Sequence, residues 1–258
     1  CTAPRLYHHD TNPALCGPTV IKAVFFDLDG TLCDSGSSWK MGVSASLELF
    51  ESRFPGRLQE FDAAWQETNS FLLSELASGR MLMRDVIRER YPRTLARIGI
   101  DDRAFADTLN DCLSETRLEA LRPMPGAHNT LRRLRPDNHL GIITNGSDAG
   151  YPDSQMATVK RIGVCELVDS IWISDAVGSR KPDPHIFIAA LEGAGVRADE
   201  AIYVGDSLSH DITGASGAGL MSVLIDPLSE FDGSCAEVIP DHVITSIPEV
   251  LQILADLK

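Results

Sequence analysis

The chain lacks long apolar runs and is short of positive charge. No apolar stretch approaches the ~18–20 residues that a bilayer-spanning helix needs, so we expect no membrane association. Lys and Arg number 23 against 37 Asp and Glu, which gives a formal net charge of −14. A nucleic-acid surface needs clustered Lys and Arg, so we expect no nucleic-acid polymer as a partner. An anionic substrate must therefore be attracted by local groups or by a bound cation.

Paired cysteines are also missing. The six cysteines, at positions 1, 16, 33, 112, 165 and 235, form no CxxC pair and show no metal-ligand spacing. In a chain of 258 residues this scatter indicates reduced thiols and a cytoplasmic protein. Residues 1–20 contain Pro, Asp and two His where a signal peptide has an apolar stretch, so we expect a loose N-terminal arm there. The oligomeric state has no signal in the sequence.

What the chain does contain is an alternation of strand-like and helix-like segments. Runs rich in β-branched residues predict strands at Ile21–Leu28, His139–Thr144, Ser170–Ser174, Ala201–Val204 and Met221–Ile225, with a last short one near His242–Ile244. Helical patterns lie between them, at Gly126–Leu134, Gln155–Ile162, His185–Ala194, Asp211–Ala218 and Pro248–Leu257. Such alternation predicts an α/β fold with a parallel sheet covered on both faces.

One long stretch breaks the alternation. Residues 37–121 show only helical patterning, so we expect an all-helical domain inserted after the first strand. The Pro-rich segment 122–126 is the expected return linker. Residues 21–36 and 122–258 would then form the catalytic core. Four aromatic residues of the insert fall partly at helical spacing, and we expect them to be core residues: Trp39, Phe61, Trp65 and Phe71.

Two carboxylates follow the first predicted strand, in the segment Asp27-Leu28-Asp29-Gly30-Thr31. Their spacing of two projects both side chains in the same direction at the carboxyl end of a strand, where open α/β sheets bind ligands. Two like charges side by side are unfavourable unless they share a cation or a proton. This pair alone is also compatible with a solvated turn.

Three further strand ends carry polar groups. The second strand ends in Thr144-Asn145-Gly146, with a hydroxyl and turn amides suited to phosphate oxygens. Lys181 follows the third strand, and Asp206 and Asp211 follow the fourth. Four successive strands thus bring polar groups to one edge of one sheet, which indicates a functional site.

In these segments the chain resembles the haloacid dehalogenase superfamily, in its phosphatase branch with a helical (subclass I) cap. The four matching motifs are DLDGT at 27–31, TNG at 144–146, the lysine of RKPDP at 180–184, and GDSLSHD at 205–211. The resemblance implies a Rossmann-like sheet in the strand order 5-4-1-2-3. It also implies that the helical insert is a mobile cap that closes over the site.

The resemblance further implies roles for single residues. Asp27 would be the nucleophile that forms an aspartyl-phosphate, and Asp29 would be the general acid and base. Mg²⁺ would bind the Asp27 carboxylate, the Asp29 backbone carbonyl and the Asp206 carboxylate. Asp211 would act one shell out, through water or by orienting Lys181, unless it only caps the next helix.

The resemblance also implies that residues of the second and third motifs bind the phosphoryl group. Thr144, Asn145 and the turn amides beside them would hold its oxygens, and Lys181 would neutralise charge in the transition state. One departure from the family pattern follows Thr144: Gln155 comes eleven residues on, so the intervening loop is longer than usual by about four residues. That loop could shape the substrate pocket or be a tolerated surface insertion.

The function predicted from these residues is a Mg²⁺-dependent phosphomonoester hydrolase that acts on a small phosphorylated metabolite through an aspartyl-phosphate. The dehalogenating members of the superfamily generally lack an acid at the position of Asp29, which favours phosphate chemistry. A phosphomutase shares all four motifs and stays open, as does a non-catalytic binding module on a retained fold. Sugar phosphates, nucleoside monophosphates and phosphorylated acids or alcohols all remain candidate substrates.

Overall fold

The computed structural model describes residues 20–148, 154–234 and 236–258. The expected arm at residues 1–20, except for its last residue, and part of the long loop after Thr144 lie outside the described residues. The helices and strands are β1 (Ala23–Phe26), α1 (Ser35–Arg53), α2 (Leu58–Ala77), α3 (Met83–Arg97), α4 (Arg103–Ala120), α5 (Ala127–Leu134), β2 (His139–Thr144), α6 (Gln155–Arg161), β3 (Ser170–Ile173), α7 (Ser174–Val177), α8 (Pro184–Ala194), β4 (Ala201–Gly205), α9 (Thr213–Gly217), β5 (Met221–Ile225), β6 (His242–Ile244) and α10 (Val250–Asp256).

The six strands form one parallel sheet in the order β3-β2-β1-β4-β5-β6. Taken from the opposite edge, the order of the first five strands is 5-4-1-2-3, which confirms the expected topology; β6 adds an edge strand beside β5. Strand β1 is central, with Phe26 opposite Ile142 of β2 and Val204 of β4. Because the strands are parallel, β1, β2 and β4 deliver the residues that follow them to the same edge of the sheet.

Apolar side chains on both faces of the sheet explain why the strands are nearly continuous apolar runs. Val24 and Phe26 of β1 point to one face, where α5, α6 and α10 cover them. Ala23 and Phe25 point to the other face, where α8 and α9 cover them. The period of two in a strand thus divides one sequence run between two separate cores.

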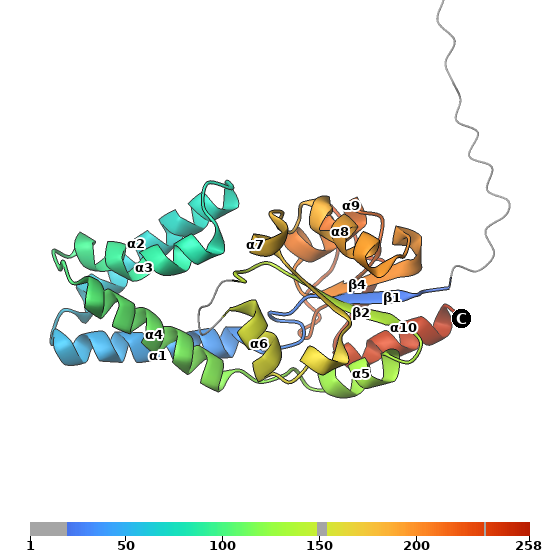
Figure 1. Cartoon of the computed structure of the whole chain (residues 1–258), viewed down its shortest axis with the longest axis horizontal. Coiled ribbons are helices and arrows are strands. Elements are labelled where there is room, and N and C mark those ends of the chain that lie inside the picture. Colours follow the sequence, from blue (N-terminus) through green and yellow to red (C-terminus); the bar gives the residue numbers. More distant parts are fainter. Residues whose placement is uncertain (1–19, 149–153, 235) are drawn as a thin grey trace, which may run out of the picture.

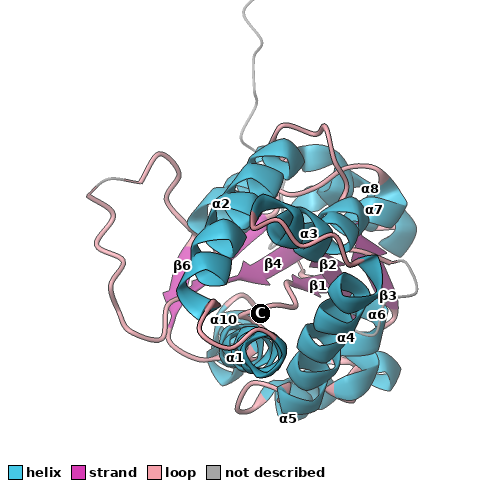
Figure 2. Ribbon diagram, turned by 90° about the vertical axis from the view of Figure 1, so that its left-hand side faces the viewer, coloured by secondary structure: helices cyan, strands magenta, loops and turns pink. Residues whose placement is uncertain are grey.

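Helices α1 to α4 come between β1 and α5 in the sequence. In space they lie beyond the carboxyl ends of the strands (Figures 1 and 2). They pack around a cluster of their own, in which the Phe50 and Phe61 rings stack at 4.0 Å. The chain leaves the sheet and returns to it side by side, because Asp34 N donates to Arg122 O at 3.0 Å and Met124 N to Leu32 O at 2.9 Å. In the described part of the chain, none of the helices has the length and apolar character needed to cross a membrane.

Candidate active site

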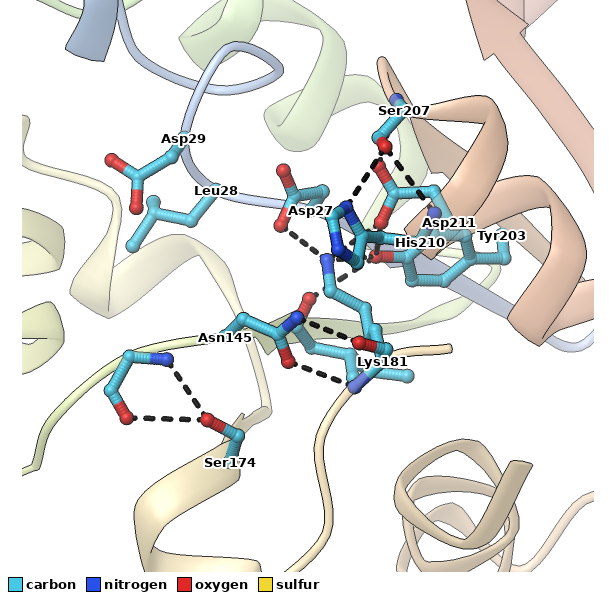
Figure 3. A network of polar contacts seen from close by, with 12 residues as sticks. Asp27, Leu28, Asp29, Asn145, Ser174, Lys181, Tyr203, Ser207, His210 and Asp211 are labelled. Atoms are coloured by element: carbon cyan, nitrogen blue, oxygen red, sulfur yellow. Dashed lines mark hydrogen bonds and ion pairs between the residues drawn. The ribbon is translucent and has the colours of Figure 1, made fainter. Parts of the chain in front are cut away.

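Lys181 lies at the centre of a buried polar cluster at the carboxyl ends of β1 and β4 (Figure 3). Its Nζ donates to Asp27 Oδ1 at 2.5 Å, to Asp211 Oδ1 at 2.6 Å and to the Tyr203 hydroxyl at 2.8 Å. An ammonium has three N–H donors, and these contacts use all of them. Ser207 N fixes the other oxygen of Asp211, at 3.0 Å. The cluster is therefore held rigidly and positions the carboxylate of Asp27.

Burial and charge oppose each other in this cluster. Burial raises the pKa of Asp27 well above its usual range, and the attraction of Lys181 only partly offsets it. Burial also acts against the charge on Lys181, but the carboxylates of Asp27 and Asp211 outweigh it and raise the pKa of the lysine. Burial beside Asp211 raises the pKa of Tyr203 as well, so its hydroxyl stays protonated. Another cation close to Asp27 would relieve this cost.

Asp206 brings a third carboxylate to the cluster. Oxygens of Asp27, Asp206 and Asp211 all lie within 4.8 Å of one another. Reduced hydration, with the charge of Asp211 adding to it, raises the pKa of Asp206 to about 6, although part of the residue is exposed. With all three carboxylates ionised, their charge together with that of Lys181 is −2, which one divalent cation would balance. Such a set of hard oxygen donors suits Mg²⁺.

Glycine at position 30 allows the approach of Asp206. Gly30 has a φ of +85°, and a Cβ there would lie 2.2 Å from Asp206 Oδ2. No other residue type could adopt this backbone conformation so close to the carboxylate without strain. The loop after β1 and the loop after β4 therefore meet at the expected cation site because this residue has no side chain.

The side chain of Asp29 points away from this cluster (Figure 3). Its Oδ2 accepts a hydrogen bond from Gln155 Nε2 at 2.8 Å, and its Oδ1 lies 3.2 Å from Nη2 of Arg117. Gln155 begins α6 and Arg117 belongs to α4, so Asp29 connects the sheet edge with both. The third carboxylate beside Asp27 and Asp206 is therefore that of Asp211 and not that of Asp29. Our assignment of Asp29 to the cation concerned its backbone carbonyl.

In the second motif, the side chain of Asn145 holds the backbone of Lys181 in place. Asn145 Oδ1 accepts from Lys181 N at 2.8 Å, and Asn145 Nδ2 donates to Lys181 O at 2.9 Å. Both ends of the Asn145 side-chain amide are therefore occupied by the backbone of Lys181. Gly146 N donates to Ser174 Oγ at 2.9 Å. Among the described residues, the buried hydroxyl of Thr144 has no hydrogen-bond partner.

A cavity of about 420 Å³ lies between the helices and this edge of the sheet. Asp29, Asn145 and Gln155 line it from the sheet side. Helices α1 to α4 contribute polar or aromatic side chains to its wall: Trp39, Asn69, Arg90 and Arg117. Its size is that of a site for a small molecule.

One of the four aromatic residues expected in the helical core lies elsewhere. Phe61 and Trp65 are buried as predicted. Trp39 is partly buried against the same helical cluster, and it also lines the cavity. Phe71 is 45% exposed on α2. Helical spacing alone could not distinguish a core position from a cavity wall, since both require an apolar face.

Arg90 and Arg117 were missed by the sequence analysis, although their spacing contains a signal. Arg90 stands three residues after Ile87 and four after Val86, both on the buried face of α3. Arg117 stands four residues after Leu113 in the same way. A charged residue in phase with a buried helix face is uncommon unless it has a partner or a function.

Comparison with known sequences points to one family. A model for haloacid dehalogenase-like hydrolases matches residues 21–219. Glyceraldehyde 3-phosphate phosphatase of Pyrococcus furiosus is 32% identical over 242 residues, covering 91% of this chain and 93% of its own. Ribulose-1,5-bisphosphate 5-phosphatase of Halopiger xanaduensis is 31% identical over 249 residues, covering 90% of this chain and 99% of its own.

Solved structures with the same fold cover nearly the whole chain. The 2-haloacid dehalogenase of Pseudomonas syringae pv. tomato is 28% identical, with a TM-score of 0.72 over 93% of this chain and all of its own. The YfnB protein of Bacillus subtilis, solved bound to magnesium, is 23% identical, with a TM-score of 0.70 over 92% of this chain and 99% of its own. This second likeness establishes the fold alone.

Proposed function

The chain belongs to the haloacid dehalogenase-like hydrolases, and from this premise we propose that it is a Mg²⁺-dependent phosphatase of a small phosphorylated metabolite. The observation that carries the proposal is the meeting of three carboxylates and one buried lysine at the sheet edge. The relatives from Pyrococcus furiosus and Halopiger xanaduensis, at 32% and 31% identity, are phosphatases of sugar phosphates, which supports phosphate ester hydrolysis over dehalogenation. The dehalogenating members generally lack an acid at the position of Asp29, so its presence in this chain supports the same choice.

The residues present fit a magnesium ion. We propose that the carboxylates of Asp27 and Asp206 and the backbone carbonyl of Asp29 hold it. Both oxygens of Asp211 already accept hydrogen bonds, from Lys181 and from Ser207, so we assign Asp211 to the positioning of Lys181. Bound Mg²⁺ would supply the positive charge that lets a phosphate anion approach the carboxylates.

In the proposed reaction the nucleophile is the carboxylate of Asp27. One of its oxygens forms a bond to phosphorus while the bond from phosphorus to the ester oxygen breaks, and Asp29 gives that oxygen a proton. A water molecule then attacks the phosphorus of the aspartyl-phosphate, and Asp29 takes its proton. Inorganic phosphate leaves and the carboxylate of Asp27 is restored.

Three further side chains support the phosphoryl group in this proposal. Lys181 places its charge beside Asp27, where negative charge builds up in the transition state. The unpaired hydroxyl of Thr144 is suited to donate to a phosphoryl oxygen. Asn145 acts through Lys181, whose backbone it holds on both sides, rather than by direct contact with phosphate. We also propose that residues 37–121 form the cap domain that closes the cavity over the substrate.

The direct test is hydrolysis of p-nitrophenyl phosphate with Mg²⁺ and with EDTA. We expect Mg²⁺-dependent release of inorganic phosphate, and we expect Asp27→Asn to lower kcat by more than about 10⁴-fold, as loss of a nucleophile does elsewhere. Circular dichroism should show that the variant is folded. Asp199→Asn is the matched control, because Asp199 lies on the surface in a pair with Arg197 and should leave kcat unchanged.

Mass spectrometry of the acid-quenched enzyme should detect one added phosphoryl group on Asp27. Turnover by Asp27→Asn at a level near that of the control would rule out the covalent route. Transfer of the phosphoryl group to a second hydroxyl of the substrate, without free phosphate, would indicate a mutase instead.

A further inference from the structure

Arg90 is a buried arginine in the wall of the cavity. It belongs to α3 in the helical insert and is 4% exposed. Burying a guanidinium is costly, so a buried arginine that lines a cavity is a candidate for binding an anionic ligand. The reaction proposed above makes no use of it.

Asn69 and Trp39 orient the plane of the Arg90 guanidinium. Its Nε donates to Asn69 Oδ1 of α2 at 3.0 Å, and its Cζ lies 5.0 Å from the centre of the Trp39 ring of α1. A cation over an indole face is stabilised by the ring and keeps its orientation. Three helices thus cooperate to hold one guanidinium at the wall of the cavity.

The wall around Arg90 suits a ligand with a short carbon chain and a negative end. Leu73, Met83 and Ile87 line the cavity beside it and supply apolar contacts. Asp29 is the only acidic residue among the described residues that line the cavity, and Arg117 and Gln155 hold it. A guanidinium in a fixed plane recognises carboxylate or phosphate through paired N–H donors.

We propose that Arg90 binds an oxyanion, a carboxylate or a second phosphate, on the part of the substrate that remains after hydrolysis. This rests on the proposed phosphatase function and specifies its substrate class. Arg90 is then a specificity residue: it selects doubly anionic substrates over phosphate monoesters with a neutral alcohol.

Two matched substrate pairs test the proposal and distinguish the two oxyanions. 3-Phosphoglycerate and glycerol 3-phosphate differ by a carboxylate in place of a hydroxymethyl group. Fructose 1,6-bisphosphate and fructose 6-phosphate differ by a second phosphate. We expect the wild-type enzyme to prefer the doubly anionic member of at least one pair, and Arg90→Gln to lower its kcat/KM by about 100-fold, mainly through KM.

The controls separate recognition from structure. In the same Arg90→Gln preparation, turnover of p-nitrophenyl phosphate and of the neutral partner should change less than about threefold, which also shows that the variant folds. Arg90→Lys should recover only part of the preference, because an ammonium lacks the planar fork. Arg93→Gln is the matched control on the same helix, since Arg93 is exposed and pairs with Glu89.

An equal loss for all substrates, or no loss for any, would overturn the proposal, as would a wild-type preference for the neutral member of both pairs. If the wild-type protein hydrolyses no phosphate ester at all, the proposed function fails, but the binding site remains testable. Calorimetric titration of 3-phosphoglycerate and of fructose 1,6-bisphosphate into wild type and Arg90→Gln then decides: equal affinity, or no binding, would refute a role for Arg90.

Discussion

The two sides of the cavity are built in different ways. On the sheet side, Asn145 lines the cavity and follows directly after β2. Asp27 and Asp206 follow β1 and β4 in the same way, and neighbouring strands bring the three residues to one edge. On the cap side, four side chains come from four different helices: Trp39, Asn69, Arg90 and Arg117. The sheet side is fixed by backbone hydrogen bonds between strands, whereas the cap side depends on how helices pack.

We expect the two sides to have different roles: the sheet side carries out the reaction, and the cap side selects the substrate. The polar contacts between the two sides include Arg117 with Asp29, and Asp175 of α7 with the amides of Met83 and Arg84. Changes on the sheet side should therefore affect every substrate, and changes on the cap side should affect substrates unequally. Three experiments test this distinction.

The largest effect is expected from Lys181→Met. It leaves the buried carboxylates of Asp27 and Asp211 without their cation, which should lower the free energy of unfolding by about 3–5 kcal/mol and abolish turnover of all substrates. Urea denaturation measures the loss. Lys258→Met is the matched control, because Lys258 pairs with Asp137 at 3.4 Å on the surface and should change stability little. Equal stability of the two variants would contradict the central position of Lys181.

A smaller effect is expected from pH in the absence of metal. The pKa of Asp206 is about 6 when folded, above its usual value, so the folded state binds this proton more tightly. Its contribution to stability is complete below about pH 4 and is lost as the pH rises through about 6. Mg²⁺ competes with that proton, so the rise in Tm caused by Mg²⁺ should grow between pH 5 and pH 7. Thermal denaturation with EDTA or Mg²⁺ measures it, and an equal Mg²⁺ effect at both pH values would exclude Asp206 as a ligand.

The smallest effect is expected from Asp175→Asn on the contact between the cap and the core. The Asp175 carboxylate accepts from Met83 N at 3.4 Å and Arg84 N at 3.3 Å, at the N-terminus of α3. Removing its charge there should weaken the contact by about 0.3–1 kcal/mol. Hydrogen exchange at the first amides of α3 should quicken, while kcat for an aryl phosphate stays the same. Asp102→Asn is the control, because Asp102 caps α4 within the cap; equal exchange at α3 in both variants would show that Asp175 does not hold the cap.

The sheet could be predicted from the sequence because its strands are buried on both faces and are therefore apolar throughout. The prediction for β1, Ile21–Leu28, was too long, since the strand ends at Phe26 and Asp27 already belongs to the loop. The helix expected at Asp211–Ala218 is two elements, a π-helical turn at Leu208–Ile212 and α9. In that turn the amides of Asp211 and Ile212 both donate to Ser207 O, which a helical pattern does not reveal.

The cap side could be predicted as helical but not as a binding wall. A helix pattern shows which face is buried, but it does not show which neighbouring helix or cavity that face meets. Arg90 becomes recognisable only when Asn69 and Trp39, both from other helices, are seen beside it. The direction of Asp29 was unpredictable for the same reason, because Arg117 and Gln155 come from distant parts of the chain.

Cys33 lies fully buried beneath the loop that carries Asp27 and Asp29. The reactivity of its thiol can therefore report on the motion of that loop. Its thiol donates to Leu28 O at 3.3 Å, and burial raises its pKa, so the reactive thiolate does not form while the loop is closed. Cys112 and Cys165 are partly exposed and would react with an alkylating reagent first. The later modification of Cys33 would then report how often the loop opens, and occupancy of the site by metal or phosphate would slow it.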